Sequence, residues 1–196
     1  LWYRSLDYSV VLAMREMVGR APIISVSTLP VCPNLRKIFV QRRSPDSDLQ
    51  PSRFHTFSGA YQTGETGIGH EGDGESLTKA AFRELAEETG LSMEHASDAR
   101  LALFNDKISG AIEFCVLGVS VRAAEVECMQ DTEEGEVVSI DFDELGTSLQ
   151  NADCNWAPGG QSEIMAWLAF GAPPMPTGVK FGRQTAKELF LSLTAV

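Results

Sequence analysis

The segment "GHEGDGESLTKAAFRELAEETGL", residues 69–91, decides how the rest of the chain is interpreted. It begins rich in glycine and then favours helix, with Gly90 as a natural C-terminal stop. The apolar stripe expected of such a helix contains Leu77, Ala80, Ala81, Leu85 and Ala86. Glu84, Glu87 and Glu88 fall within five positions of one another. Since residues three and four positions apart share one helical face, we predict a helix over 75–90 with three carboxylates grouped together.

The grouping of these glutamates needs a physical reason. Like charges at this spacing repel each other, at a cost of roughly a few tenths of a kcal/mol per pair in water and more where the face is partly buried. A divalent cation would offset that cost, because Mg²⁺ takes oxygen ligands from carboxylates, water and substrate phosphates. The alternative is a solvated acidic helix face with Lys79 and Arg83 as partners.

Further elements are predicted on both sides of this helix. Strands are expected over 22–31, 35–43, 54–63, 99–105, 111–122 and 135–142, the first two as a hairpin. Other helices are expected over 5–18, 141–149, 162–171 and 182–196. Strands before and after one helix, with more helix at the end, predict a mixed sheet packed between helices.

The spacing of residues 69–91 separates the two interpretations of the acidic helix. Gly69 is followed after five residues by Glu75, and after seven more by Arg83-Glu84-Leu85, one residue, Glu87-Glu88, one residue and Gly90-Leu91. At every defined position the segment resembles the Nudix box, the signature of the Nudix hydrolases. The resemblance is tight over these residues and extends loosely, in the order of elements, over 20–170.

This resemblance implies a fold and a site. The fold would be of the α/β class, a Nudix-type α/β/α sandwich with a mixed central sheet. Residues 1–196 would form a single Nudix hydrolase domain, with 1–20 as a candidate N-terminal helical extension. Carried onto this sequence, the metal ligands would be Glu84, Glu87, Glu88 and the backbone of Gly69. One of the three glutamates could orient or deprotonate the attacking water, and Glu75 and Arg83 would brace the loop and helix at the catalytic site.

The implied activity is Mg²⁺- or Mn²⁺-dependent hydrolysis of a diphosphate linkage in a nucleoside diphosphate derivative. Its second group, X, is unknown, and a nucleotide sugar or ADP-ribose would be examples. One alternative is a catalytically weak Nudix-like sensor or scaffold that binds a nucleotide metabolite. Another, an isomerase of isoprenoid diphosphates, is suggested by Gly69-His70, but its catalytic cysteine motif has no match here. His70 is expected to be a loop residue.

Residues outside the box add candidates for the site. The run "FSGAYQTGETGIGHEGDGES" lacks the Pro-Gly-Gly that commonly precedes the box in the family. An additional acid or base could come from Glu133, Glu134 or Glu136, although a solvated acidic loop is the simpler interpretation. Phosphate could be bound by Arg42, Arg43 or Arg53, for which a surface role is equally plausible. A base could stack on Trp156, Phe54 or Phe104, with core packing favoured for the two phenylalanines.

Composition limits the classes of partner. A formal net charge of -11 argues against binding nucleic acid, since a phosphate backbone requires a basic face. No window has the length and apolarity of a membrane span, and the first twenty residues do not resemble a signal peptide. The four cysteines are scattered, which is typical of free thiols and a cytoplasmic location. A homodimer is expected by analogy with family members alone.

Overall fold

The computed structural model describes residues 23–47, 50–61, 75–93, 99–105, 112–151 and 154–171. The helices predicted over 5–18 and 182–196 lie outside these ranges. The glycine-rich segment 64–74, with Gly69 and His70, also lies outside them. Those predictions stay as they are.

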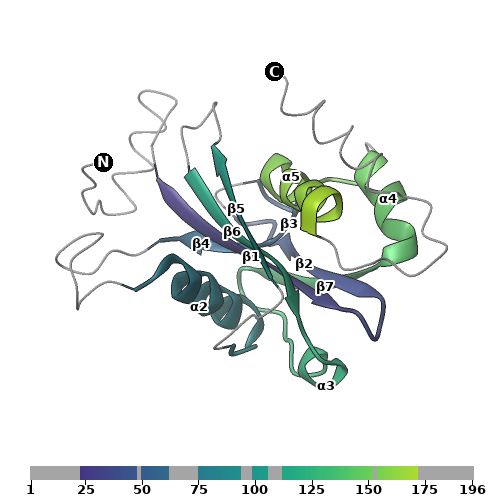
Figure 1. Ribbon diagram of the computed structural model, residues 1–196, viewed down its shortest axis with the longest axis horizontal. Helices are drawn as coiled ribbons and strands as arrows, with labels where there is room; N and C mark the ends of the chain where they lie inside the picture. The colour runs from purple at the N-terminus through teal and green to yellow at the C-terminus, as the bar shows by residue number, and fades with distance from the viewer. Residues whose placement is uncertain are drawn as a thin grey trace.

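The strands of the described residues form one mixed sheet (Figure 1). They are β1 (Ile24–Cys32), β2 (Lys37–Arg43), β3 (Phe54–His55), β4 (Phe57–Ala60), β5 (Arg100–Asn105), β6 (Ile112–Ser120) and β7 (Gly135–Asp141). β1 is parallel to β6 on one edge. On its other edge β1 pairs antiparallel with β4 and then, near its end, with β2. β2 pairs with β3 and β7, and β5 pairs with β6, so β1 joins two groups of strands.

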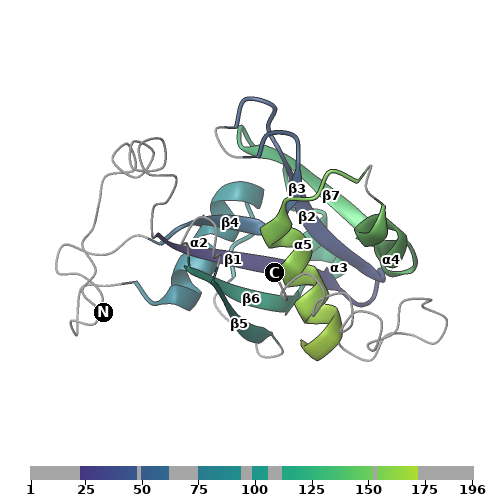
Figure 2. The same cartoon turned by 90° about the horizontal axis from the view of Figure 1, so that it is seen from above.

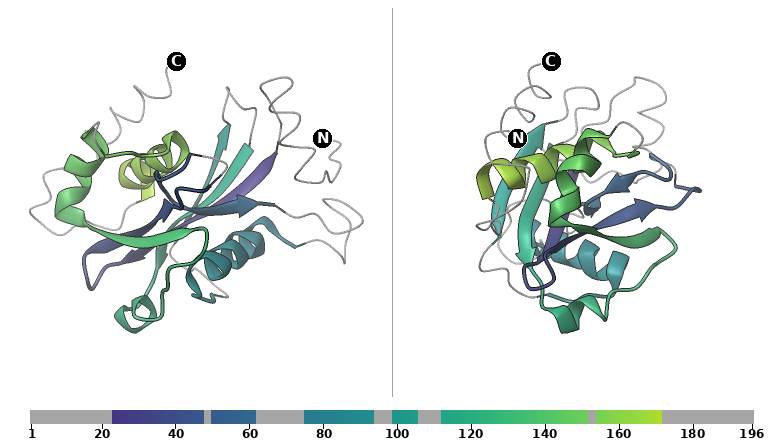
Figure 3. Two further views of the ribbon diagram at one scale, coloured as in Figure 1. Left: turned by 180° about the vertical axis from the view of Figure 1, so that it is seen from behind. Right: turned by 90° about the vertical axis from the view of Figure 1, so that its right-hand side faces the viewer.

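Helices cover both faces of the sheet (Figures 1 and 3). α2 (Leu77–Thr89) lies on one face, whereas α4 (Phe142–Gln150) and α5 (Pro158–Ala166) lie on the other. Neighbouring residues of β1 point alternately to these two layers, as the pleat of a strand requires. The hydroxyl of Ser27 donates to Glu163 in α5, and the hydroxyl of Thr28 donates to the carbonyl of Ala81 in α2.

The helix predicted over 75–90 is confirmed, with its ends set by local chemistry. The side chain of Ser76 caps the start by accepting a hydrogen bond from the N–H of Lys79 at 3.2 Å. Gly90 ends the helix in the left-handed conformation, with φ of 75°. The buried stripe differs in part from the prediction, because Phe82 is buried and Ala86 is only partly buried. Small alanines at the contact allow α2 to lie close to the sheet.

The second layer forms the larger core. Residues of α4, α5 and the π-helical segment η1 (Trp167–Gly171) pack against the sheet, with Leu145, Ile164, Met165, Trp167 and Leu168 buried. β6 bulges at Gly118, where φ is 76° and where a Cβ atom would lie 2.5 Å from Nε1 of Trp167. Glycine is therefore required at this position both by the backbone and by the indole ring.

The predicted elements agree with the structure apart from a few details. The strand predicted over 54–63 is interrupted at Thr56, because its first residues pair with β2 and the following ones with β1. The last described helix begins at Pro158 rather than at 162, and proline suits its first turn. A short helix, α3 (Ala123–Val126), was not predicted. In the ranges that the structure describes, no helix is both long and apolar enough to cross a membrane.

Candidate functional site

Strand β4 packs against the acidic face of α2 and contacts two of its glutamates. Glu84 and Glu88 are buried, whereas the side chain of Glu87 is 57% exposed. Oε2 of Glu88 accepts a hydrogen bond from the backbone N–H of Ser58 at 2.7 Å. The carboxylate of Glu84 lies over Gly59, where a Cβ atom would be 2.0 Å from Oε2. The absence of a side chain at Gly59 therefore makes room for Glu84.

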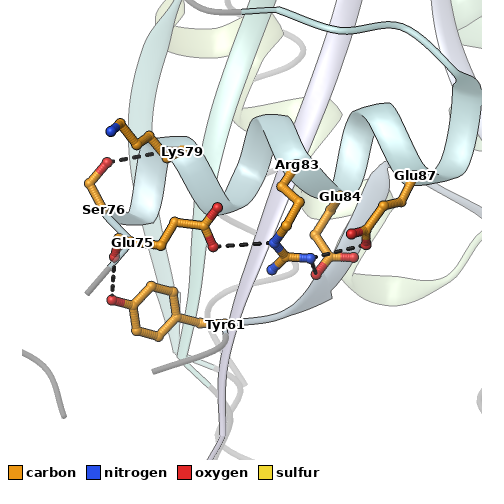
Figure 4. A network of polar contacts seen from close by, with 7 residues as sticks. All are labelled: Tyr61, Glu75, Ser76, Lys79, Arg83, Glu84 and Glu87. Carbon is orange, nitrogen blue, oxygen red and sulfur yellow. Dashed lines mark hydrogen bonds and ion pairs between the residues drawn. The ribbon is translucent and has the colours of Figure 1, made fainter. Parts of the chain in front are cut away.

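Arg83 connects the carboxylates along the helix (Figure 4). Its Nε lies 3.2 Å from Oε2 of Glu75, and its Nη1 lies 2.7 Å from Oε1 of Glu84 and 3.0 Å from Oε2 of Glu87. The backbone carbonyl of Glu75 in turn accepts a hydrogen bond from the hydroxyl of Tyr61. The bracing role predicted for Glu75 and Arg83 requires such contacts. Each of these contacts of Arg83 uses one of the two carboxylate oxygens of its partner and leaves the second oxygen outside that contact.

Burial makes the negative charge of this region expensive. Burial raises the pKa of Glu88 well above its usual range, and the charges of Glu134 and Glu84 raise it further, against Arg43 and the N–H of Ser58. Burial also raises the pKa of Glu84, although the hydrogen bond and charge of Arg83 lower it. The site therefore favours whatever supplies positive charge to it, a proton or a cation.

The three acidic candidates at the start of β7, Glu133 and Glu134 before the strand and Glu136 within it, have different surroundings. Glu136 pairs with Arg42 across the β2–β7 ladder, with Nε of Arg42 2.9 Å from Oε2 of Glu136. Glu133 is exposed. Glu134 is exposed as well, but its charge raises the pKa of both Glu84 and Glu88. Of these three candidates for an additional acid or base, Glu134 is the one whose charge contributes to the raised pKa values of Glu84 and Glu88.

The three candidate arginines are also distinguished. Arg43 donates from Nη2 to the hydroxyl of Ser58 at 3.2 Å, and its charge lowers the pKa of Glu88 against burial. Nε of Arg43 is buried and has no hydrogen-bond partner among the described residues. Arg42 is held in its surface ion pair with Glu136. The backbone carbonyl of Arg53 accepts a hydrogen bond from the N–H of Arg43 at 3.0 Å. Of the three candidate arginines, Arg43 is therefore the one whose side chain contacts β4 and whose charge acts on a buried glutamate of α2.

Two residues at the site were missed by the sequence analysis, Ser58 and Gly59. They belong to the run before the box that departs from the family's commonest pattern. A glycine inside a strand often marks a close approach by another group, and this signal could have identified Gly59.

The three aromatic candidates belong to the core. Trp156 is buried, and its Nε1 donates to the carbonyl of Ser148 at 3.1 Å. Its ring centroid lies 5.4 Å from that of Phe54. Phe54 and Phe104 are partly buried against the core on the α5 face. The preference for core packing of the phenylalanines agrees with these contacts.

Comparison with known proteins identifies the fold. No family model matches the sequence, and no curated protein does either. Among solved structures, the MutT protein from Methanosarcina mazei Go1 has a TM-score of 0.53 at 20% identity, over 75% of this chain and 93% of that one. A Nudix hydrolase from Nitrosomonas europaea has a TM-score of 0.53 at 17% identity, over 79% and 94%.

A longer protein is similar as well. The bifunctional NMN adenylyltransferase/ADP ribose pyrophosphatase from Francisella tularensis has a TM-score of 0.58 at 15% identity, over 84% of this chain and 47% of that one. The chain thus spans about half of that protein. A structure of the Francisella protein with AMP and a manganese ion gives a TM-score of 0.55 at 16% identity, over 82% and 46%. The present chain therefore has the fold of the Nudix hydrolases, and the predicted fold class is confirmed.

We predict that Glu88→Gln stabilises the metal-free protein at neutral pH. A raised pKa in the folded state means that Glu88 contributes fully to stability below its ordinary pKa of 4.5, and that this contribution is lost as the pH rises through the folded-state pKa. The amide removes the charge and keeps an oxygen that can accept from Ser58. Urea unfolding in EDTA from about pH 5 to 8 should show the wild type losing stability relative to the variant.

The matched control is Glu144→Gln, the same change at an exposed position in α4 on the other layer. This control should follow the wild type at each pH. If Glu88→Gln and wild type were to run parallel over the whole range, the assignment of buried charge to Glu88 would be wrong.

Proposed function

We propose that this protein hydrolyses a diphosphate linkage in a nucleoside diphosphate derivative, with Mg²⁺ or Mn²⁺ as its cofactor. The observation that carries the proposal is the burial of Glu84 and Glu88 together between α2 and β4. Buried carboxylates are costly unless a positive partner balances them. The Nudix hydrolase fold supports the same conclusion, because structural neighbours include an ADP ribose pyrophosphatase.

The donor set fits a hard divalent cation. Carboxylate oxygens are the ligands that Mg²⁺ and Mn²⁺ prefer. Arg83 contacts one oxygen each of Glu84 and Glu87, and Ser58 contacts one oxygen of Glu88, so each carboxylate has a second oxygen to offer. When bound, the ions would neutralise the diphosphate and lower the pKa of a coordinated water. The backbone of Gly69 stays a predicted additional ligand.

The chain's own residues have distinct tasks in this proposal. β4 fixes Glu84 and Glu88, and Arg83 braces the helix face as Glu75 holds its Nε. Glu87, at the exposed edge, meets the incoming substrate first. Glu134 is our candidate for orienting or deprotonating the attacking water. Water attacks one phosphorus, the bridging P–O bond breaks, and the products are a nucleoside monophosphate and phospho-X.

Charge and similarity support this substrate class. A chain with a formal net charge of -11 repels a free diphosphate, so cations between the two are needed for binding. The Francisella tularensis protein binds AMP and a manganese ion, which supports a nucleotide ligand and a manganese-type cofactor here. The identity of X, the choice of metal, the homodimer and the cytoplasmic location stay predictions.

A second candidate function is a nucleotide-metabolite sensor without turnover. The network of Arg83 favours it, because one guanidinium partly neutralises Glu75, Glu84 and Glu87 without any ion. A sensor would bind its ligand tightly in the presence of metal and release no product. Retention of every carboxylate of the box makes hydrolysis the better supported function.

We predict hydrolysis of at least one member of a panel of nucleotide sugars, ADP-ribose, dinucleoside polyphosphates and nucleoside triphosphates, only with Mg²⁺ or Mn²⁺ present. Glu87→Gln and Glu88→Gln should lower kcat by about 100-fold or more, because loss of a charged ligand weakens stabilisation of the developing charge. Product release is followed by chromatography. Glu144→Gln is again the matched control and should retain wild-type kcat, and equal activity in all variants would rule out the proposed metal site.

We predict that Arg43→Ala and Arg42→Ala differ in effect although the residues are adjacent. Arg43→Ala should lower kcat/KM by about tenfold or more, since a charged hydrogen bond to phosphate is lost. Arg42→Ala removes only a half-exposed ion pair with Glu136 and should change kcat/KM by less than about threefold. Steady-state kinetics with the best substrate of the panel measures both, and the reverse order of effects would assign phosphate binding to Arg42.

A further inference from the structure

A second group of ligand-type side chains lies on the face of the sheet opposite α2. It consists of His55 in β3, Glu113 in β6 and Glu163 in α5, and one ligand atom from each lies within 4.8 Å of the others. The hydroxyl of Ser27 in β1 reaches Glu163, which assigns the group to the layer of α5. Figure 2 shows α5 crossing over the strands on this side. Three elements far apart in the sequence thus meet here.

His55 is held as a neutral ring with a defined tautomer. Its Nδ1 lies 2.8 Å from the carbonyl oxygen of Thr56, and because a carbonyl only accepts, Nδ1 carries the proton. Burial and the charge of Arg43 lower the pKa of His55 to about 4, against the hydrogen bond to Thr56. The lone pair therefore lies on Nε2. An imidazole whose other nitrogen donates to a backbone carbonyl is the usual arrangement of a metal-binding histidine.

Nε2 of His55 and a carboxylate oxygen of Glu113 line the same small space. A Cβ atom at Gly159 would lie 3.2 Å from Nε2 of His55 and 3.4 Å from Oε2 of Glu113. At Gly160 a Cβ atom would lie 2.9 Å from the Cα atom of His55. The glycine pair at the start of α5 therefore allows the helix to approach His55 closely and leaves the ligand atoms uncovered by a side chain at Gly159.

Glu163 points into this group from a fully buried position. Its Oε2 accepts hydrogen bonds from the hydroxyls of Ser27 and Thr56, each at 2.8 Å. Its Oε1 is buried without a hydrogen-bond donor among the described residues. Burial raises the pKa of Glu163, while hydrogen bonding, including one with Glu113, lowers it. Two carboxylates can share such a contact only if a proton or a cation lies between them.

We propose that His55, Glu113 and Glu163 bind one divalent transition-metal ion, with Zn²⁺ as the chemical type. Imidazole nitrogen and carboxylate oxygen are both zinc ligands, and three protein ligands around a tetrahedral ion leave a fourth position for water or another ligand. A nitrogen ligand disfavours Mg²⁺. Ser27 and Thr56 orient Glu163, and the Thr56 carbonyl orients His55. The ion would tie β3, β6 and α5 together, independently of the glutamates of α2.

The experiment measures Zn²⁺ binding to the full chain after EDTA treatment, in the presence of a reducing agent, by competition with a chromogenic chelator and by metal analysis. His55→Gln and Glu163→Gln should weaken one Zn²⁺ site by about tenfold or more. The amide of the second variant keeps an acceptor for Ser27 and Thr56. Glu87→Gln is the control and should leave this Zn²⁺ site intact, and excess Mg²⁺ should not displace the ion.

Long-range ¹H–¹⁵N NMR of the histidine rings provides the readout that does not depend on a variant folding. Zn²⁺ should shift the Nε2 signal of His55 and leave Nδ1 protonated. The inference is overturned if Nε2 does not respond, or if both variants bind Zn²⁺ like the wild type. It is also overturned if Glu87→Gln is the only variant that loses Zn²⁺ binding, because the ion would then lie at the glutamates of α2. That result would not count against the proposed hydrolysis. If Glu113 and Glu163 share a proton and bind no ion, Nε2 of His55 should not respond to Zn²⁺ and the variants should bind Zn²⁺ like the wild type.

Discussion

Two carboxylates buried side by side between α2 and β4 are the constraint on which the remainder of the site depends. Glu84 and Glu88 cannot be removed from water without a partner, and the partners present are the N–H of Ser58 and the guanidinium of Arg83. Alanines on α2 bring the helix close to the sheet, and Gly59 leaves the space that the Glu84 carboxylate fills. The raised pKa values of both glutamates indicate that these partners do not fully compensate the burial. A proton or a cation would complete the balance, and our proposal of metal-dependent chemistry assigns this part to a cation.

The sequence predicts the local part of this arrangement well. Helix ends follow from Ser76 and Gly90, and the grouping of the three glutamates along one side of α2 follows from helical spacing. The burial of Glu84 and Glu88 but not of Glu87 depends on how α2 packs on the sheet. The order of the strands, their register and the contacts of each side chain depend on tertiary packing and do not follow from local sequence. The sequence left Arg42, Arg43 and Arg53 as equal candidates, because which side chain of β2 meets Glu136 and which meets Ser58 depends on the pairing of β2 with β7 and on the position of β4. The same pairing commits Glu136 to Arg42 and leaves Glu134 to act on the buried glutamates.

Some features have no local signal at all. The interruption at Thr56 arises because the chain leaves β2 for β1, a change of partner that no periodicity reports. Residues only two positions apart therefore contact opposite layers: the hydroxyl of Thr56 donates to Glu163 on the α5 face, and the backbone N–H of Ser58 donates to Glu88 on the α2 face. The hydroxyl of Ser58 also lies 3.3 Å from Nδ1 of His55. The short segment 55–58 thus contributes to both the proposed active site and the proposed zinc site. The two sites use different ligands but share this piece of backbone.

The central claim is that divalent cations bind between the carboxylates of α2. An anomalous difference map from crystals containing Mn²⁺ tests it most directly. The account predicts a peak coordinated by oxygens of Glu84, Glu87 and Glu88, with the contacts of Arg83 to Glu84 and Glu87 rearranged. A map without density among these glutamates at saturating Mn²⁺, with Arg83 still bridging Glu84 and Glu87, would contradict it.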